Sequence, residues 1–211
     1  MSKLVDFTNK TVFILGGGPS LLNDDQLGLL EGHLENQKIH KRRVIAINES
    51  IYCALYADIL FFRDIAWYFG NREIVETWDG VVVTTTPSRF YNENENCTNV
   101  NIVQLKHSSD FLIGGDTIRY GRSSGHLALS LAINLGAKRC VLLGFDCRFV
   151  DGRSHFHSEN NRTTALTYSS DFLPAWNGWG DAARRAGVEV VNATPNSAII
   201  EFPYKPLAEV L

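Results

Sequence analysis

The chain has 211 residues, of which 45% are hydrophobic and 20% charged, enough for one globular domain with a substantial core. Its formal net charge of −3 gives no reason to expect a general affinity for nucleic acid or for anionic membranes. No apolar run is long enough to span a bilayer, no signal-peptide core is visible and the four cysteines lack CxxC spacing, which favours a cytoplasmic protein with free thiols.

Short apolar runs predict seven strands. Most are continuously apolar without strict alternation, as strands are when helices cover both faces of a parallel sheet. In chain order the predicted strands are residues 11–15, 43–48, 58–63, 80–85, 100–105, 139–146 and 188–194. Helical patterns between them predict helices at residues 23–33, 50–56, 65–76, 125–135 and 173–185. The alternation favours a single-domain α/β fold over residues 1–211, Rossmann-like and doubly wound around a mostly parallel sheet.

Two polar segments interrupt this alternation. Residues 86–99 are rich in turn formers and predict a loop. Residues 147–171 are also polar, contain two histidines and are too long for a simple connection. Loops of that length are usually functional, so we expect this one to contribute to a site.

The first strand runs directly into the sequence GGGPS, and we call its residues Gly16 to Gly18 the glycine corner. Gly16, Gly17 and Gly18 remove side-chain bulk, Pro19 suits the first position of a helix, and Ser20 can bond an amide or a phosphate. The pattern is neither GxGxxG nor a P-loop, which argues against the usual dinucleotide and nucleoside-triphosphate motifs. A tight strand-to-helix turn with no ligand explains these residues equally well.

Polar residues also follow other predicted strands. In an open α/β sheet, ligands bind beyond the carboxyl ends of the strands, where the strand order reverses. Hydroxyls, amides and a helix N-terminus at that edge suit a ligand that contains a phosphate and a ribose. The residues concerned are Asn48, Glu49, Arg63, Asp64, Arg122, Ser123, Ser124, Gly125 and Asp146.

The order of these motifs resembles that of the bacterial lipooligosaccharide sialyltransferases, glycosyltransferase family 42. The segments that carry the resemblance are GGGPSL, INES, RSSGHLALSLAINLGAKRCVLLGFD, a histidine-containing loop and TPNSAI. The same outline is similar to a wider group that includes hydroxymethylpterin pyrophosphokinase-like proteins and uncharacterised phage and prophage proteins. The helix-strand unit at residues 122–146 and TPNSAI at 194–199 are the most specific parts.

The resemblance implies a cytidine nucleotide sugar as donor, a glycan or other hydroxyl acceptor, and no metal or other cofactor. It places Gly17, Gly18, Ser20, Asn48, Ser123, Ser124 and Gly125 in the nucleotide pocket, and the turn at Asn196 and Ser197 would close over this pocket. It also implies a loop histidine as general base, for which His155 and His157 are the candidates; imidazole suits this role at neutral pH. The family's two phosphate-binding tyrosines are missing, because Phe149 and either Ser154 or His155 occupy those places.

Alternatives remain open at the sequence level. His155 and His157, two residues apart, could bind a divalent metal with Asp146 or Asp151, or could belong to a merely polar loop. His126 is expected on a helix surface or in the pocket lining, and Trp176 with Trp179 in the core.

Two other functions compete with glycosyl transfer. One is ATP-dependent pyrophosphate transfer, with Asp64 and Asp146 around Mg²⁺. The other is a non-catalytic phage or prophage accessory protein with a vestigial pocket. A homo-oligomer is possible under each of these functions.

Overall fold

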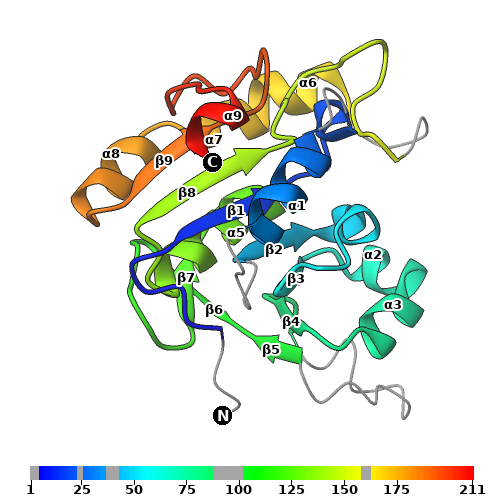
Figure 1. Ribbon diagram of the computed structural model, residues 1–211, viewed down its shortest axis with the longest axis vertical. Helices are drawn as coiled ribbons and strands as arrows, with labels where there is room; N and C mark the ends of the chain where they lie inside the picture. The colour runs from blue at the N-terminus through cyan, green and yellow to red at the C-terminus, as the bar shows by residue number, and fades with distance from the viewer. Residues whose placement is uncertain (1–4, 23–25, 37–42, 88–101, 158–162) are drawn as a thin grey trace.

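The computed structural model describes residues 5–22, 26–36, 43–87, 102–157 and 163–211 (Figure 1). Seven parallel strands form the main sheet in the order β5-β4-β3-β2-β1-β8-β9. They are β1 (Thr11–Leu15), β2 (Val44–Ile47), β3 (Ile59–Phe62), β4 (Val81–Thr84), β5 (Ile102–Gln104), β8 (Arg139–Leu143) and β9 (Glu189–Asn192). Each lies within one of the seven predicted runs, so the prediction of an α/β fold with a mostly parallel sheet is confirmed.

Alternate residues of the strands contribute their side chains to two separate hydrophobic cores, one on each face of the sheet. Ile14 of β1 belongs to one core and its neighbours Phe13 and Leu15 to the other, as expected when successive side chains point to opposite faces. Helices α5 (Ser124–Asn134) and α8 (Trp179–Arg185) pack on the first face. Helices α1 (Gln26–Asn36), α2 (Ile65–Gly70), α3 (Arg72–Thr77) and α9 (Leu207–Val210) pack on the second. Both faces are covered, which explains why the strands are continuously apolar.

The strand order reverses at β1. From β1 the chain adds β2, β3, β4 and β5 on one side, and then crosses back to place β8 and β9 on the other. The glycine corner that follows β1 therefore lies at the switch point between the two halves of the sheet. Parallel α/β sheets bind ligands in the crevice at this point.

The helices depart from the predictions in detail. The predicted helix at 65–76 is divided at Asn71 into α2 and α3, and Asn71 donates a backbone hydrogen bond to Trp67 O and Tyr68 O. The predicted helix at 173–185 is divided into α7 (Leu173–Ala175) and α8, because Gly178 between them has a left-handed backbone. A 3-10 helix, η2 (Asn48–Cys53), stands where a helix over 50–56 was predicted.

Other elements were not predicted. Strands β6 (Lys106–Ser108) and β7 (Thr117–Arg119) form a separate two-stranded parallel sheet. The segment predicted as a functional loop contains a short helix α6 (Ala165–Thr167) and one turn of π-helix, η3 (Tyr168–Phe172). A short 3-10 helix, η1 (Pro19–Leu22), follows the glycine corner.

Some predicted segments lie partly outside the described residues. These are the start of the helix at 23–33, the first two residues of the strand at 100–105, most of the loop at 86–99 and residues 158–162 of the functional loop. Within the part of the chain that the structure describes, no helix has the length and apolarity needed to cross a membrane.

Candidate functional site

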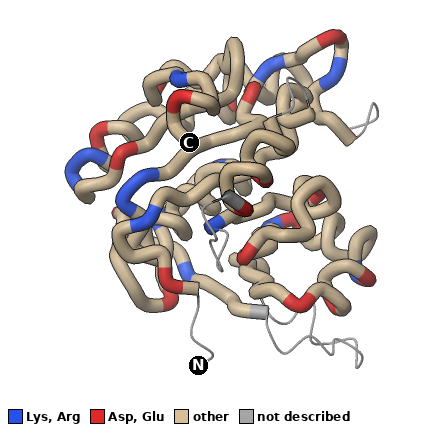
Figure 2. The backbone as a smooth tube through the Cα atoms, in the orientation of Figure 1, with Lys and Arg blue, Asp and Glu red and all other residues tan. Residues whose placement is uncertain are grey.

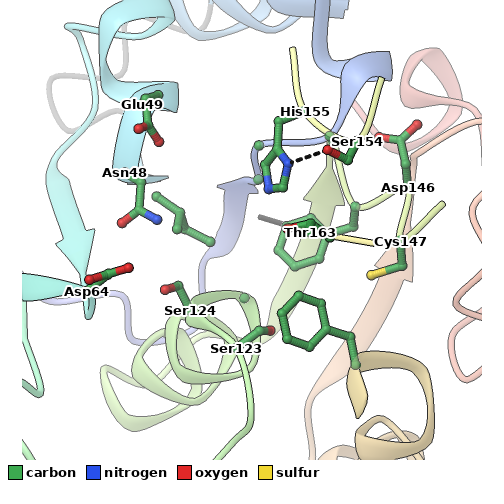
Figure 3. Close-up of a pocket in the computed structure, with 18 of the residues that line it drawn as sticks. Asn48, Glu49, Asp64, Ser123, Ser124, Asp146, Cys147, Ser154, His155 and Thr163 are labelled. Atoms are coloured by element: carbon green, nitrogen blue, oxygen red, sulfur yellow. Dashed lines mark hydrogen bonds between the residues drawn. The ribbon is translucent and has the colours of Figure 1, made fainter. Parts of the chain in front are cut away.

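A cleft of about 780 Å³ opens at the carboxyl ends of the strands. It is lined by the ends of β1, β2 and β3, by the start of α5, and by parts of the segment from 144 to 176 (Figure 3). Most residues singled out from the sequence meet here. Those that line the cleft are Gly16, Gly17, Gly18, Asn48, Glu49, Asp64, Arg122, Ser123, Ser124, Gly125, Asp146, His155 and His157.

The three glycines of the corner have different roles. A Cβ on Gly16 would lie 2.6 Å from the carbonyl oxygen of Gly144, and one on Gly18 would lie 1.9 Å from Asp146 Oδ2. These two glycines let the turn pack directly against the end of β8. A Cβ on Gly17 would instead meet the His155 ring at 3.0 Å. The missing side chain of Gly17 leaves room for the histidine loop.

A backbone hydrogen bond holds the histidine loop to this corner. The amide of Phe156 donates to the carbonyl oxygen of Gly17 at 3.0 Å, so the residues on either side of Phe156 lie over the turn. Those residues are His155 and His157, whose ring centroids are 5.3 Å apart. Figure 3 shows the His155 ring directed into the cleft. One loop segment thus brings both candidate bases to the corner.

The two histidines have different environments. Nε2 of His157 lies 3.5 Å from Oε2 of Glu49, and both side chains are about one-quarter exposed, at 24% and 25%. His155 is more enclosed: its Nδ1 lies 3.2 Å from the hydroxyl of Ser154. Burial, and secondarily the charge of His157, lowers the pKa of His155 to about 4. His155 is therefore neutral at physiological pH, whereas His157 has a carboxylate beside it.

Asp146 supplies a buried carboxylate to the cleft. Its Oδ2 accepts hydrogen bonds from the hydroxyl of Ser20 at 2.9 Å and from the Ser20 amide at 3.4 Å. Its Oδ1 is buried and has no hydrogen-bond partner among the described residues. Burial raises the pKa of this carboxyl, although the bonds from Ser20 oppose the shift. A ligand hydroxyl or amine could satisfy Oδ1.

The start of α5 forms the opposite wall. Ser123 is the N-cap residue, and its hydroxyl lies 2.8 Å from Nδ1 of His126. A Cβ on Gly125 would lie 2.7 Å from the Phe145 ring, so glycine lets β8 and α5 approach closely. The first-turn amides of this helix lack intrahelical partners and carry partial positive charge, which suits an anionic group.

His126 itself does not line the cleft, contrary to expectation. It is fully buried, and its ring stacks on Trp176 with centroids 3.6 Å apart while Trp179 meets it edge-on. Burial lowers its pKa to about 3. Trp176 and Trp179 are buried, as predicted, although Trp176 also contributes to the cleft lining.

The ends of β2 and β3 complete the cleft. Asn48 has a left-handed backbone with φ of 52°, and its buried Oδ1 has no partner among the described residues. Asp64 caps α2 by accepting a hydrogen bond from the amide of Ala66 at 2.8 Å. Trp67 lines the same side with a buried indole nitrogen that has no partner in the described part of the chain. Unpaired polar atoms at a cleft are those that a ligand can satisfy.

Four residues predicted at the site lie outside the lining. Ser20 supports Asp146 from behind the corner, and Pro19 is buried beside it in η1. Ser197 donates to the carbonyl oxygen of Phe145 at 2.6 Å, and the carbonyl oxygen of Asn196 accepts from Arg148. In this structure the turn at Asn196 and Ser197 therefore stabilises the segment after β8 that contains Asp146.

Sequence reasoning missed several lining residues. They include Thr163, Tyr168 and Phe172, which come from the long polar segment; Arg63, which the sequence placed with Asp64 at a strand end, also lines the cleft. Tyr168 is a buried phenol whose hydroxyl donates to the carbonyl oxygen of Ser154 at 2.8 Å, and burial raises its pKa. The family resemblance did not indicate Tyr168, because the family's tyrosines correspond to Phe149 and to Ser154 or His155. Tyr168 lies further along the chain, about twenty residues beyond Asp146.

The acidic residues of the cleft are dispersed. Across the described ranges no group of three or more His, Cys, Asp or Glu side chains is arranged to hold a metal ion. Asp64 is engaged in capping α2, and Asp146 is held by Ser20.

Comparison with solved structures identifies the class of fold as that of the bacterial sialyltransferases. The monofunctional α-2,3-sialyltransferase Cst-I from Campylobacter jejuni aligns with a TM-score of 0.56 at 13% identity, over 98% of this chain and 84% of that one. The sialyltransferase CstII from the same organism, in complex with cytidine-5′-monophosphate, aligns with a TM-score of 0.51 at 13% identity, over 93% of this chain and 85% of that one. No family model and no curated protein matches the chain. The resemblance to pyrophosphokinase-like and phage proteins stays a prediction.

Proposed function

We propose that the protein is a metal-independent glycosyltransferase that transfers a sugar from a CMP-activated donor to a hydroxyl group of a glycan or other acceptor. The observation that supports this proposal most strongly is the convergence of three features on one cleft. These are the glycine corner, the N-terminus of α5 and a loop that bears two histidines. The likeness of the fold to that of the sialyltransferases Cst-I and CstII also supports the proposal.

In this proposal the donor phosphate lies between the glycine corner and α5. The amides at the start of the helix and the hydroxyls of Ser123 and Ser124 are the donors available to it. Asp146 Oδ1 and Asn48 Oδ1, which lack partners among the described residues, accept hydrogen bonds from the nucleoside. This arrangement stabilises the negative charge that develops on CMP as it leaves.

His157 is the general base of the proposed reaction. If Nε2–H of His157 faces the Glu49 carboxylate, Nδ1 is left as the proton acceptor. The acceptor hydroxyl loses its proton to Nδ1 as its oxygen attacks the anomeric carbon, and the bond from that carbon to the CMP phosphate breaks. Glu49 stabilises the imidazolium that forms.

His155 has a different role, because a pKa near 4 makes it a weak base at neutral pH. With Nδ1 accepting from Ser154, its Nε2–H becomes a hydrogen-bond donor at the corner. We propose that His155 donates this hydrogen bond to the phosphate of the leaving CMP. Tyr168 is a further neutral group in this region, but its proton is engaged with Ser154.

Donor hydrolysis tests the activity without knowledge of the acceptor. The protein is incubated with CMP-sialic acid and excess EDTA, and released CMP is measured by chromatography. The proposal predicts CMP release above the uncatalysed rate in EDTA. No release, or release that requires added Mg²⁺, would refute it.

A further inference from the structure

Arg63 occupies a defined position on the β3 side of the cleft. It follows the last residue of β3, and its Nη1 donates to the carbonyl oxygens of Gly121 at 3.2 Å and Arg122 at 3.0 Å. Its own carbonyl oxygen accepts a hydrogen bond from Thr86 at 2.5 Å. The guanidinium is thus anchored against the loop before α5, on the wall of the cleft.

The charge of Arg63 is not balanced by a close carboxylate. Arg122, the other arginine of the lining, pairs with Asp171 at 2.6 Å, whereas Arg63 makes no ion pair within the described part of the chain. The adjacent carboxylate, Asp64, bonds the amide of Ala66. An arginine has five N–H donors, and two backbone carbonyls and the Tyr120 hydroxyl do not exhaust them.

The positive charge of Arg63 contributes to lowering the pKa values of two neighbouring side chains, Tyr120 and His107. Hydrogen bonding to Arg63 and its charge, followed by Arg122, lower the pKa of the Tyr120 phenol. Burial, with the charge of Arg63 second, lowers the pKa of His107. Tyr120 also lies under the guanidinium, with 5.7 Å from Cζ to the ring centroid.

We propose that Arg63 forms a second anion subsite of the cleft, which binds a carboxylate or phosphate on the sugar or on the acceptor. A half-buried, prepositioned guanidinium binds such groups through paired N–H donors. The inference rests on the proposed function in that it names a feature of the substrate. The proposed subsite lies on the β3 side of the cleft, whereas the donor phosphate is proposed to lie between the glycine corner and the first turn of α5. If Arg63 had only a structural role, it would connect β3 to the loop before α5, and its replacement would not change the binding of anions.

Binding measurements with Arg63→Gln test the subsite, with Arg72→Gln as the control. Arg72 lies on α3, outside the cleft lining, and pairs with Glu76. Arg72→Gln therefore removes the same positive charge as Arg63→Gln, but at a position away from the cleft. Calorimetry with lactate, a small hydroxycarboxylate, is run with and without saturating CMP. We expect lactate to bind the wild type and Arg72→Gln equally and Arg63→Gln at least about tenfold more weakly. CMP affinity should be the same in all three proteins.

The outcomes separate this inference from the proposed function. If CMP fails to bind but lactate binding still requires Arg63, the donor assignment is wrong and the subsite stands. Equal lactate binding by the wild type and Arg63→Gln, or none by either, overturns the subsite. Should Arg63→Gln not fold, Arg63→Lys replaces it: loss of the planar fork should weaken lactate binding, and unchanged binding overturns the inference.

Kinetics then assign the anion to the donor or to the acceptor. A rise in KM for CMP-sialic acid in Arg63→Gln, with the KM ratio of sialyllactose to lactose unchanged, places the anion on the sugar. A rise confined to sialyllactose, which adds a carboxylate to lactose, places it on the acceptor. If neither KM changes, Arg63 does not bind a substrate anion and the inference is wrong.

Discussion

The Oε2 atom of Glu49 lies 3.5 Å from Nε2 of His157, which joins the end of β2 to the loop that follows β8. A carboxylate beside one imidazole nitrogen orients the ring and strengthens the other nitrogen as a base. The proposed mechanism therefore makes specific claims about both residues.

His157→Ala should lower donor turnover by about 10²- to 10⁴-fold, the usual contribution of a general base. Glu49→Gln should lower it less, since the ring stays in place and loses only its charged partner. CMP affinity should change little in either variant, because neither side chain is assigned to the nucleotide. Single-turnover rates and CMP calorimetry measure the two effects separately. A full rate in His157→Ala would exclude it as the base.

The glycine corner gives a prediction about stability. Gly18→Ala should lower the free energy of unfolding by about 1–3 kcal/mol or more, because the new Cβ would overlap Asp146 and the Gly144 carbonyl. Gly17→Ala should be milder, since its Cβ meets only the edge of the His155 side chain. Urea denaturation measures both.

Gly32→Ala is the matched control for these variants. Gly32 lies within α1, and a Cβ there would meet nothing within 4 Å. This variant should be stabilised by about 0.5–1 kcal/mol, as expected for alanine in a helix. Equal stability of Gly18→Ala and the wild type would contradict the close packing of the corner on β8.

Stability should fall as pH is lowered from about 6.5 to 4. His126 and His155 have pKa values of about 3 and 4, below the value of about 6.5 expected in the unfolded chain. In this window the unfolded chain binds protons that the folded protein does not, so acid favours unfolding, by up to about 1.4 kcal/mol per pH unit for each histidine.

His126→Phe tests the larger part of this effect. Phenylalanine preserves stacking between Trp176 and Trp179 but cannot bind a proton, so the dependence of stability on pH should become shallower between 4 and 6. Denaturation at several pH values gives the slope independently of any overall loss caused by removing the Ser123 contact. An unchanged slope would show that His126 is not buried in its neutral form.

The strands could be predicted because burial on both faces leaves a direct sequence signal. Thr11–Leu15 was predicted without error, and the other six strands lie inside longer predicted runs. Strand β6 left no such signal, since its residues Lys106, His107 and Ser108 are polar and largely exposed. The break at Asn71 follows Gly70, and the Asn71 side chain closes α2 by donating to the carbonyl oxygen of Trp67 at 2.9 Å, which hydrophobic periodicity does not indicate.

The candidate site could be predicted where it follows topology. The glycine corner, Asn48, Asp64 and the start of α5 all lie at the carboxyl edge of the sheet, where a parallel order places them. Tyr168 and the contact of Glu49 with His157 depend on how a long polar segment folds back over that edge. The contact of Glu49 with His157 joins residues more than a hundred positions apart, and the Tyr168 hydroxyl reaches Ser154 across 14 positions, so neither leaves a local pattern.

The most direct test of the account is calorimetric titration of the protein with CMP in EDTA. The account predicts binding with a Kd between about 1 μM and 1 mM, unaffected by Mg²⁺, and weaker binding of UDP and ATP. Absence of CMP binding, or binding of ATP alone and only with Mg²⁺, would contradict it.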